Sequence, residues 1–170
     1  AFDRLKDQPA YVFTHDIDYN RCMKNTIKVA KIEHDFGIRA TFFFLVNAGY
    51  SLDRQVLLEL KAMGHTIGLH GVTYDLRLAM RSKAEKFERM AYGRDKLEDL
   101  SEGSIRSFRN HSLMYSPDFI DCMDSLNLDL SSNMFPRGNL SSMNVNFCWP
   151  FKYSGKNVFE VPTTWPLDTH

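Results

Sequence analysis

The sequence contains little cysteine, and its few cysteines exclude two classes of site. Cys22, Cys122 and Cys148 lie far apart and form no Cys-x-x-Cys pair. They therefore indicate neither a disulfide framework nor a thiolate zinc site, and they favour a reducing compartment. On this ground we expect a cytoplasmic protein, with export left open because the printed sequence need not start where the protein does.

The sequence also lacks an excess of either charge and a long apolar run. Lys and Arg together number 21, as do Asp and Glu, so the formal net charge is zero. A balanced charge provides no field that would attract nucleic acid or an anionic membrane. The longest apolar run, residues 40–46, is far shorter than the roughly 20 residues of a membrane-spanning helix. We therefore expect a soluble chain with no nucleic-acid partner and no membrane span.

What the sequence does contain is a regular alternation of strand and helix patterns. Its 170 residues, 44% of them hydrophobic, are enough to bury the core of one domain, which we expect to cover residues 1–170. Short apolar segments predict strands at 11–13, 40–46, 65–70, 105–108, 128–130 and 158–161. Helical periodicity predicts helices over 20–37, 51–64, 80–100 and 117–126, with a long loop at 133–157. This alternation predicts an α/β fold with a mostly parallel sheet or barrel.

Polar side chains suited to catalysis follow three of the predicted strands. Asp16 and Asp18 come after the first strand, His70 ends the third, and Arg109 and His111 follow the fourth. The carboxyl ends of parallel strands meet at one edge of a sheet, so we expect these side chains to converge. A divalent cation bound by one of two neighbouring carboxylates relieves their repulsion and leaves the other free as a base. An imidazole beside them favours zinc or a similar ion.

Each of these residues, taken alone, has an ordinary structural interpretation. A lone Asp-x-Asp segment is as often a turn as a site, and a single strand-end histidine is more often a hydrogen-bonded buried side chain. An arginine after a short strand is usually a surface cation. His65, at the opposite end of its strand from His70, is interpreted as structural. It is the occurrence of such residues at three strand ends that favours a site.

Five segments of the sequence carry a family resemblance. They are Thr14-His15-Asp16-Ile17-Asp18, Ala40-Thr41-Phe42-Phe43, Gly64-His65-Thr66-Ile67-Gly68-Leu69-His70, Phe108-Arg109 and Leu128-Asp129-Leu130-Ser131-Ser132. In order and spacing they resemble the motifs of the NodB-like polysaccharide deacetylases, carbohydrate esterase family 4, over residues 11–168. The resemblance implies a distorted (β/α) barrel, a single divalent metal that is usually zinc, and a carbohydrate substrate. Because 170 residues are tight for a full barrel, we also expect either that the last element is absent or that the chain is a fragment.

The resemblance also implies roles for single residues. Asp16 matches the general base, Asp18 and His70 match metal ligands, and Arg109 matches the arginine that orients the base. The implied enzyme is a metal-dependent deacetylase, a hydrolase of carbon–nitrogen bonds other than peptide bonds, which removes an acetyl group from an amino sugar or polysaccharide. Surface polysaccharide is included among the implied substrates.

The sequence departs from the family pattern at several positions. Tyr74 stands where the family has its second ligand histidine, and His111 stands where it has a proline. We predict that His111 supplies the lost imidazole, with Tyr74, Asp75 and a water as alternatives for the third ligand. The family's C-terminal Leu-x-His is not clear in Leu167-Asp168-Thr169-His170, which leaves the general acid open. Glu160-Val161-Pro162 resembles a divergent branch of the family.

Two other functions stay open at this point. Tyr74 and the unclear C-terminal motif are also compatible with an inactive deacetylase-like domain that only binds carbohydrate. Asp16 and Asp18 would alternatively suit the manganese and nucleotide-sugar site of a glycosyltransferase, but the strands that should precede such a site are missing. The sequence has no Gly-x-Gly-x-x-Gly, phosphate-loop or Gly-x-Ser-x-Gly segment, so it favours neither a nucleotide cofactor nor a serine hydrolase.

Overall fold

A computed structural model describes residues 11–75, 77–134 and 149–163 of the chain. Its strands are β1 (Phe13–Ile17), β2 (Ala40–Leu45), β3 (Thr66–Gly71), β4 (Ser107–Phe108), β5 (Leu130–Ser131), β6 (Phe151–Lys152) and β7 (Phe159–Glu160). Its α-helices are α1 (Asn20–Asp35), α2 (Arg54–Ala62), α3 (Lys83–Ser101) and α4 (Pro117–Ser125), with short 3-10 turns at Leu78–Met80 and His111–Leu113.

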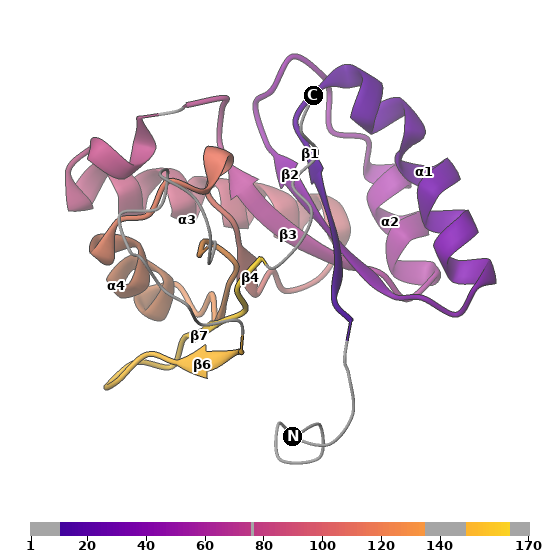
Figure 1. The fold of residues 1–170 in the computed structure, drawn as a ribbon. Helices are drawn as coiled ribbons and strands as arrows, with labels where there is room; N and C mark the ends of the chain where they lie inside the picture. The colour runs from indigo at the N-terminus through magenta and orange to yellow at the C-terminus, as the bar shows by residue number, and fades with distance from the viewer. Residues whose placement is uncertain (1–10, 76, 135–148, 164–170) are drawn as a thin grey trace.

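The strands form one sheet in the order β1-β2-β3-β4-β5-β7-β6, with the helices around its outer side (Figure 1). Neighbouring strands are parallel except β6, which pairs antiparallel with β7. This confirms the predicted α/β fold with a mostly parallel sheet. The carboxyl ends of the first five strands therefore meet at one edge. Among the described helices, none has the length and apolar character needed to cross a bilayer.

The strand register divides the sheet into two faces. One residue from each of the first four strands lies in a row that is buried in the hydrophobic core: Ile17, Phe44, Leu69 and Phe108. The fully buried Leu57 and Leu60 of α2 and Leu97 of α3 belong to the same core. Successive residues of a strand point to opposite faces of the sheet. In each strand, the residues directly before and after the one in this row therefore face the inner side, where the polar side chains lie.

Several predicted boundaries are confirmed, and others are wrong. Gly37 and Gly64 follow α1 and α2 with φ of 73° and 84°, which confirms them as the glycines that end these helices. The predicted cap Ser51 is wrong, because the Asp53 side chain accepts from the backbone N–H of Gln55 at 2.8 Å and begins α2. The helix predicted from residue 80 begins only at residue 83, where the Ser82 side chain caps it.

Two strand predictions also need correction. The first strand does not end at residue 13 but begins there, because Phe13 to Ile17 pair with β2 along their whole length. Asp16 therefore lies within a strand rather than after it. The long loop predicted at 133–157 contains β6, whose Phe151 and Lys152 pair with β7. β4, β5 and β7 are shorter than predicted, with two residues each.

Gly68 of β3 leaves room for an aromatic ring beside the site. A Cβ atom at Gly68 would lie 2.5 Å from the ring of Phe43 and 2.6 Å from the Ser107 hydroxyl. Phe43 is buried, and the centroid of its ring lies 4.5 Å from the guanidinium carbon of Arg109. The missing side chain at Gly68 therefore sets the position of the ring against which Arg109 packs.

We predict that Gly68→Ala lowers the free energy of unfolding by about 1–3 kcal/mol, because the added methyl group overpacks a buried contact. Urea denaturation of the purified variant measures this change. Gly49→Ala is the matched control: a Cβ there meets nothing within 4 Å, so we expect a change within about 0.5 kcal/mol. Equal effects of the two substitutions would contradict the packing argument.

Candidate active site

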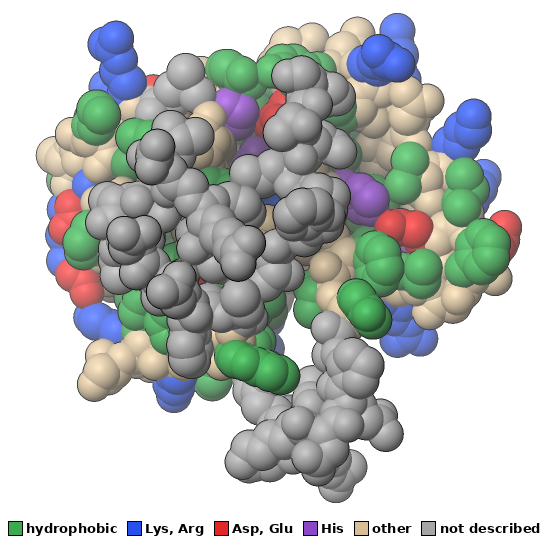
Figure 2. Space-filling view, viewed as in Figure 1, with side chains coloured by type: hydrophobic (Ala, Val, Ile, Leu, Met, Phe, Trp, Pro, Cys, Tyr) green, Lys and Arg blue, Asp and Glu red, His purple; other side chains and the backbone are tan. Residues whose placement is uncertain are grey.

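The structure brings the five residues predicted for the site to one edge of the sheet. Asp16 lies near the end of β1 and Asp18 follows that strand, His70 lies in β3, and Arg109 and His111 follow β4. Figure 2 shows histidine and acidic side chains next to one another on this face of the molecule. Strand order therefore produces the convergence that the sequence predicts.

Asp18, His70 and His111 form a cluster that could hold a metal ion. Each offers one ligand atom within 4.8 Å of the other two. The Oδ1 atom of Asp18 lies 3.2 Å from Nε2 of His70 and 3.2 Å from Nδ1 of His111. Both histidines are buried, whereas Asp18 is partly exposed. Two imidazoles and a carboxylate are a donor set that zinc accepts while keeping a position open for water.

The imidazole of His70 is oriented by a backbone carbonyl. Its Nδ1 atom lies 2.8 Å from the carbonyl oxygen of Arg109. A carbonyl oxygen only accepts, so Nδ1 is the donor, and Nε2 is the atom turned toward Asp18. Histidine ligands of metals are typically held in this way, with the second nitrogen donating to a carbonyl or carboxylate.

The pKa shifts within the cluster indicate that it favours a positive charge. Burial acts to raise the pKa of the Asp18 carboxyl, but hydrogen bonds with His111 and His70 outweigh burial and lower that pKa below its ordinary 3.8. Burial acts to lower the pKa of His70, but the charge of Asp16 and the hydrogen bond to Asp18 outweigh burial and raise it. Both shifts favour a positive charge beside Asp18, which either a proton or a cation can supply.

Asp16 lies beside the cluster and is held by Arg109. The Nη1 atom of Arg109 donates to Oδ1 of Asp16 at 2.8 Å and to the Thr14 hydroxyl at 3.0 Å. The other oxygen of Asp16, Oδ2, lies 3.7 Å from Nε2 of His70. Arg109 is buried, whereas a third of the Asp16 side chain is exposed. One carboxylate oxygen is thus fixed by the arginine, and the other faces the cluster.

The two side chains weighed against His111 as third ligand are engaged elsewhere. The hydroxyl of Tyr74 lies 2.8 Å from that of Tyr19, and the Tyr74 ring packs on His111 with the centroids 4.0 Å apart. Asp75 accepts from Nε of Arg81 at 3.0 Å. The geometry therefore favours His111 over both as the partner of Asp18.

Sequence reasoning left His65 outside the site, and the structure confirms this interpretation. Its Nδ1 atom accepts from the backbone N–H of Ala40 at 3.1 Å, and its Nε2 atom lies 3.0 Å from the carbonyl oxygen of Ala30. His65 is buried and its ring ties the start of β2 to α1. The segment Leu167-Asp168-Thr169-His170, which left the general acid open, lies outside the described residues.

Sequence reasoning missed the residue that holds Arg109 from the other side, Ser132. The Nε and Nη2 atoms of Arg109 donate to the carbonyl oxygen of Ser132 at 3.1 Å and to its hydroxyl at 2.8 Å. Ser132 directly follows β5, whose Ser131 pairs with Phe108 of β4. Ser132 could have been found from its position at a further strand end, in a segment that already carried the family resemblance.

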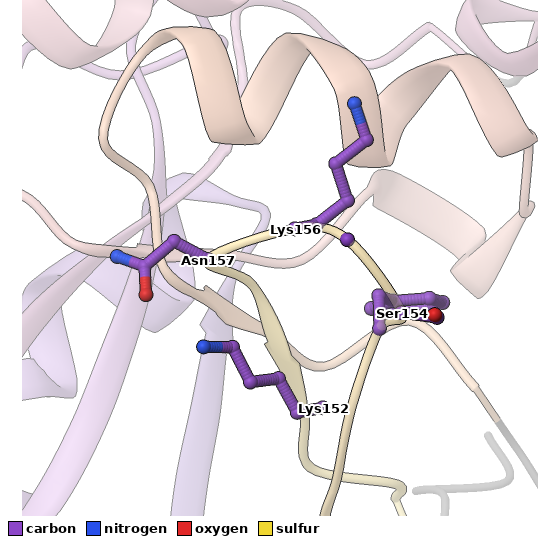
Figure 3. Close-up of a pocket in the computed structure, with 6 residues that line it drawn as sticks. Lys152, Ser154, Lys156 and Asn157 are labelled. Carbon is purple, nitrogen blue, oxygen red and sulfur yellow. The ribbon is translucent and has the colours of Figure 1, made fainter.

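A separate hollow lies at the turn of the β6–β7 hairpin and is lined by residues 152–157 (Figure 3). Lys152, Ser154, Lys156 and Asn157 are among its lining residues. None of the five site residues contributes to it. We therefore assign it no part in the site.

Comparison with known proteins gives a match to one family over most of the chain. The family model described as polysaccharide deacetylase matches residues 4–131, which is most of the chain. No curated protein matches the sequence. The match ends at β5, so it includes the strands that carry the five site residues.

Solved structures show the same fold at low sequence identity. A structure from Mycobacterium smegmatis assigned to the polysaccharide deacetylases has a TM-score of 0.70 and 15% identity, covering 91% of this chain and 58% of that one. The chitin deacetylase of the fungal pathogen Colletotrichum lindemuthianum gives 0.61 and 18%, covering 73% and 55%. A CE4 family pseudoenzyme from Bacillus anthracis gives 0.61 and 14%, covering 71% and 41%. These likenesses confirm the barrel-type α/β fold, and the chain spans less than two thirds of each of these proteins.

We predict that His111→Ala weakens Zn²⁺ binding at least about tenfold, because it removes one of the two imidazoles of the cluster. Isothermal titration calorimetry of the purified protein measures the affinity. Tyr74→Phe is the matched control, since it keeps the ring packed on His111 and removes only the hydroxyl, and we expect an affinity within about twofold of the original. Loss of affinity in Tyr74→Phe alone would contradict the assignment.

Proposed function

Since the chain belongs to the polysaccharide deacetylase family, we propose that it is a metal-dependent hydrolase that removes an acetyl group from an amino sugar or polysaccharide. The observation that carries this proposal is the Asp18, His70 and His111 cluster, with ligand atoms within 4.8 Å of one another and the carboxylate of Asp16 beside it. A cation site and a separate carboxylate are the two parts that metal-assisted attack of water on an acetyl carbonyl uses.

The cluster fits a divalent cation for three reasons. Its donors, two imidazoles and a carboxylate, are those zinc prefers. The carbonyl of Arg109 fixes His70 with Nε2 toward Asp18. His111 is buried, and its Nδ1 atom lies 3.2 Å from the same Asp18 oxygen that Nε2 of His70 faces, so both imidazoles are turned toward one point. We propose Asp18, His70 and His111 as the residues that hold the ion.

In the proposed reaction, the protein's own groups position and deprotonate the attacking water. A bound divalent cation would polarise the acetyl carbonyl and acidify the water. Asp16 accepts the proton of that water at Oδ2, because its Oδ1 atom is bound to Arg109. Arg109 keeps the carboxylate aimed at the cluster, since its guanidinium is fixed on both sides. Asp16 is the proposed general base and Arg109 its positioning residue.

A catalytically inactive carbohydrate-binding domain is the second candidate. It is supported by Tyr74 in place of the family's second histidine and by the likeness to the Bacillus anthracis pseudoenzyme. His111 weighs against it, because its imidazole approaches Asp18 from another strand end. The position of His111 is therefore better explained by a hydrolytic site that holds a metal ion than by an inactive carbohydrate-binding site.

We predict that Asp16→Asn lowers acetate release from chitin oligomers or acetylated polysaccharide at least about 100-fold, because it removes the general base. Zn²⁺ affinity should stay within about threefold, since Asp16 lies outside the cluster. An enzymatic acetate assay and calorimetry measure the two quantities. Asp121→Asn, which removes the charge of a partly exposed carboxylate bound by Lys83 and Lys156, should change neither.

Full activity of Asp16→Asn would refute the assigned base. Protein that binds Zn²⁺ yet releases no acetate from N-acetylated and O-acetylated glycans would favour the carbohydrate-binding candidate instead.

A further inference from the structure

Glu160 of β7 is a fully buried carboxylate that the proposed reaction does not use. Its Oε1 atom accepts from the backbone N–H groups of Asn133 at 2.7 Å and Met134 at 2.9 Å. Its Oε2 atom accepts from the hydroxyls of Ser131 and, at 3.1 Å, of Tyr153. A buried carboxylate is tolerated only when donors surround it, and here four donors do so.

These donors show what the carboxylate holds in place. Glu160 is the register partner of Ser131 in the β5–β7 pair, and two of its donors are backbone groups of the segment directly after β5. That segment, residues 132–134, is buried throughout. Because N–H groups that point at a shared oxygen have their directions fixed, the carboxylate sets the conformation of this segment at the edge of the sheet.

Ser132, the first residue of the segment, is connected to the proposed general base through Arg109. Ser132 accepts two hydrogen bonds from Arg109, one at its carbonyl and one at its hydroxyl. Arg109 donates on its other side to Asp16. A displacement of the Ser132 backbone would therefore move the guanidinium and, with it, the carboxylate that faces the cluster.

Asn133, the second residue of the segment, is connected to His111 through Asn110. The Oδ1 atom of Asn133 accepts from the backbone N–H of Asn110 at 2.6 Å, and its Nδ2 atom donates to the carbonyl of Phe108 at 3.2 Å. Asn110 directly precedes His111 in the chain. The Asn133 side chain thus fixes the backbone from which the His111 imidazole reaches Asp18.

We infer that Glu160 is a positioning residue that sets, through residues 132 and 133, both the Arg109–Asp16 pair and the place of His111. None of its hydrogen-bond partners among the described residues belongs to the five site residues, so it acts only through others. The inference rests on the proposed function, and it assigns a role to a motif, Glu160-Val161-Pro162, that the reaction leaves unexplained.

The test compares Glu160→Ala with Glu160→Gln. Alanine leaves two buried N–H groups without their acceptor, whereas the glutamine carbonyl accepts from both and its NH₂ group donates to the two hydroxyls, which also accept. For Glu160→Ala we expect Zn²⁺ affinity to fall at least about tenfold and kcat to fall with it, as for other residues that orient ligands. Glu160→Gln should restore both to within about threefold of the original.

Two further variants test the connection through Ser132 and the connection through Asn133 separately. They also test the inference if Glu160→Ala does not fold. Ser132→Ala removes the hydroxyl that accepts from Arg109 and lies 3.4 Å from the Thr163 hydroxyl, and it leaves Asn133 and Asn110 in place. We therefore expect kcat to fall about tenfold while Zn²⁺ affinity stays within about twofold. Asn133→Ala removes the bond to Asn110, so Zn²⁺ affinity should fall about tenfold. Lys156→Ala, in the same hairpin as Glu160, is the control and should change neither quantity. Calorimetry with Zn²⁺, steady-state acetate release and thermal unfolding are measured on every variant.

The outcomes distinguish this inference from the proposed function. Glu160→Ala with unchanged Zn²⁺ affinity and kcat would overturn the inference and leave the proposed function standing. Equal losses of affinity and kcat in Ser132→Ala and Asn133→Ala, in proportion to lost thermal stability, would also overturn it by showing a general folding role. Protein that binds Zn²⁺ but releases no acetate would refute the proposed function, while the affinities of the Glu160 and Asn133 variants would still decide the inference.

Discussion

Arg109 joins the two sides of the site, and the positions of both Asp16 and His70 depend on it. It donates to Asp16 at the end of β1 and to Ser132 after β5, and it packs on the Phe43 ring that Gly68 admits. Its own carbonyl orients His70. A planar, permanently charged fork suits this task better than lysine, because it reaches several acceptors in fixed directions.

Around this arginine, the chain brings together, from three separate strand ends, a donor set that we propose holds a metal ion. Asp18 follows β1, His70 lies in β3 and His111 follows β4, so no two of the proposed ligands come from the same strand end. The tyrosine at position 74 does not leave the cluster short of an imidazole, because His111 approaches Asp18 from the end of β4, the strand next to β3. Under the proposed assignment, the fold keeps two imidazoles and a carboxylate while one ligand changes its position in the sequence.

The sequence predicted the parts of this structure that depend on local patterns. Gly37 and Gly64 marked helix ends, and polar residues at strand ends marked the site, because both are set by the nearby chain. The role of Glu160 was not predictable, since it arises only when β7 pairs with β5 and brings a carboxylate to the backbone of Asn133. β1 was placed too early because Thr14 and Asp16, which face the site, interrupt the apolar pattern that marks a strand.

The central claim is that two imidazoles and the Asp18 carboxylate hold one divalent cation beside a separate base. X-ray absorption spectroscopy at the zinc edge, on protein loaded with Zn²⁺ and freed of excess ion, tests it most directly because it counts the nitrogen donors. The account predicts one zinc per chain with two imidazole nitrogens and otherwise oxygen donors. A spectrum with a single imidazole, or with none, would contradict it.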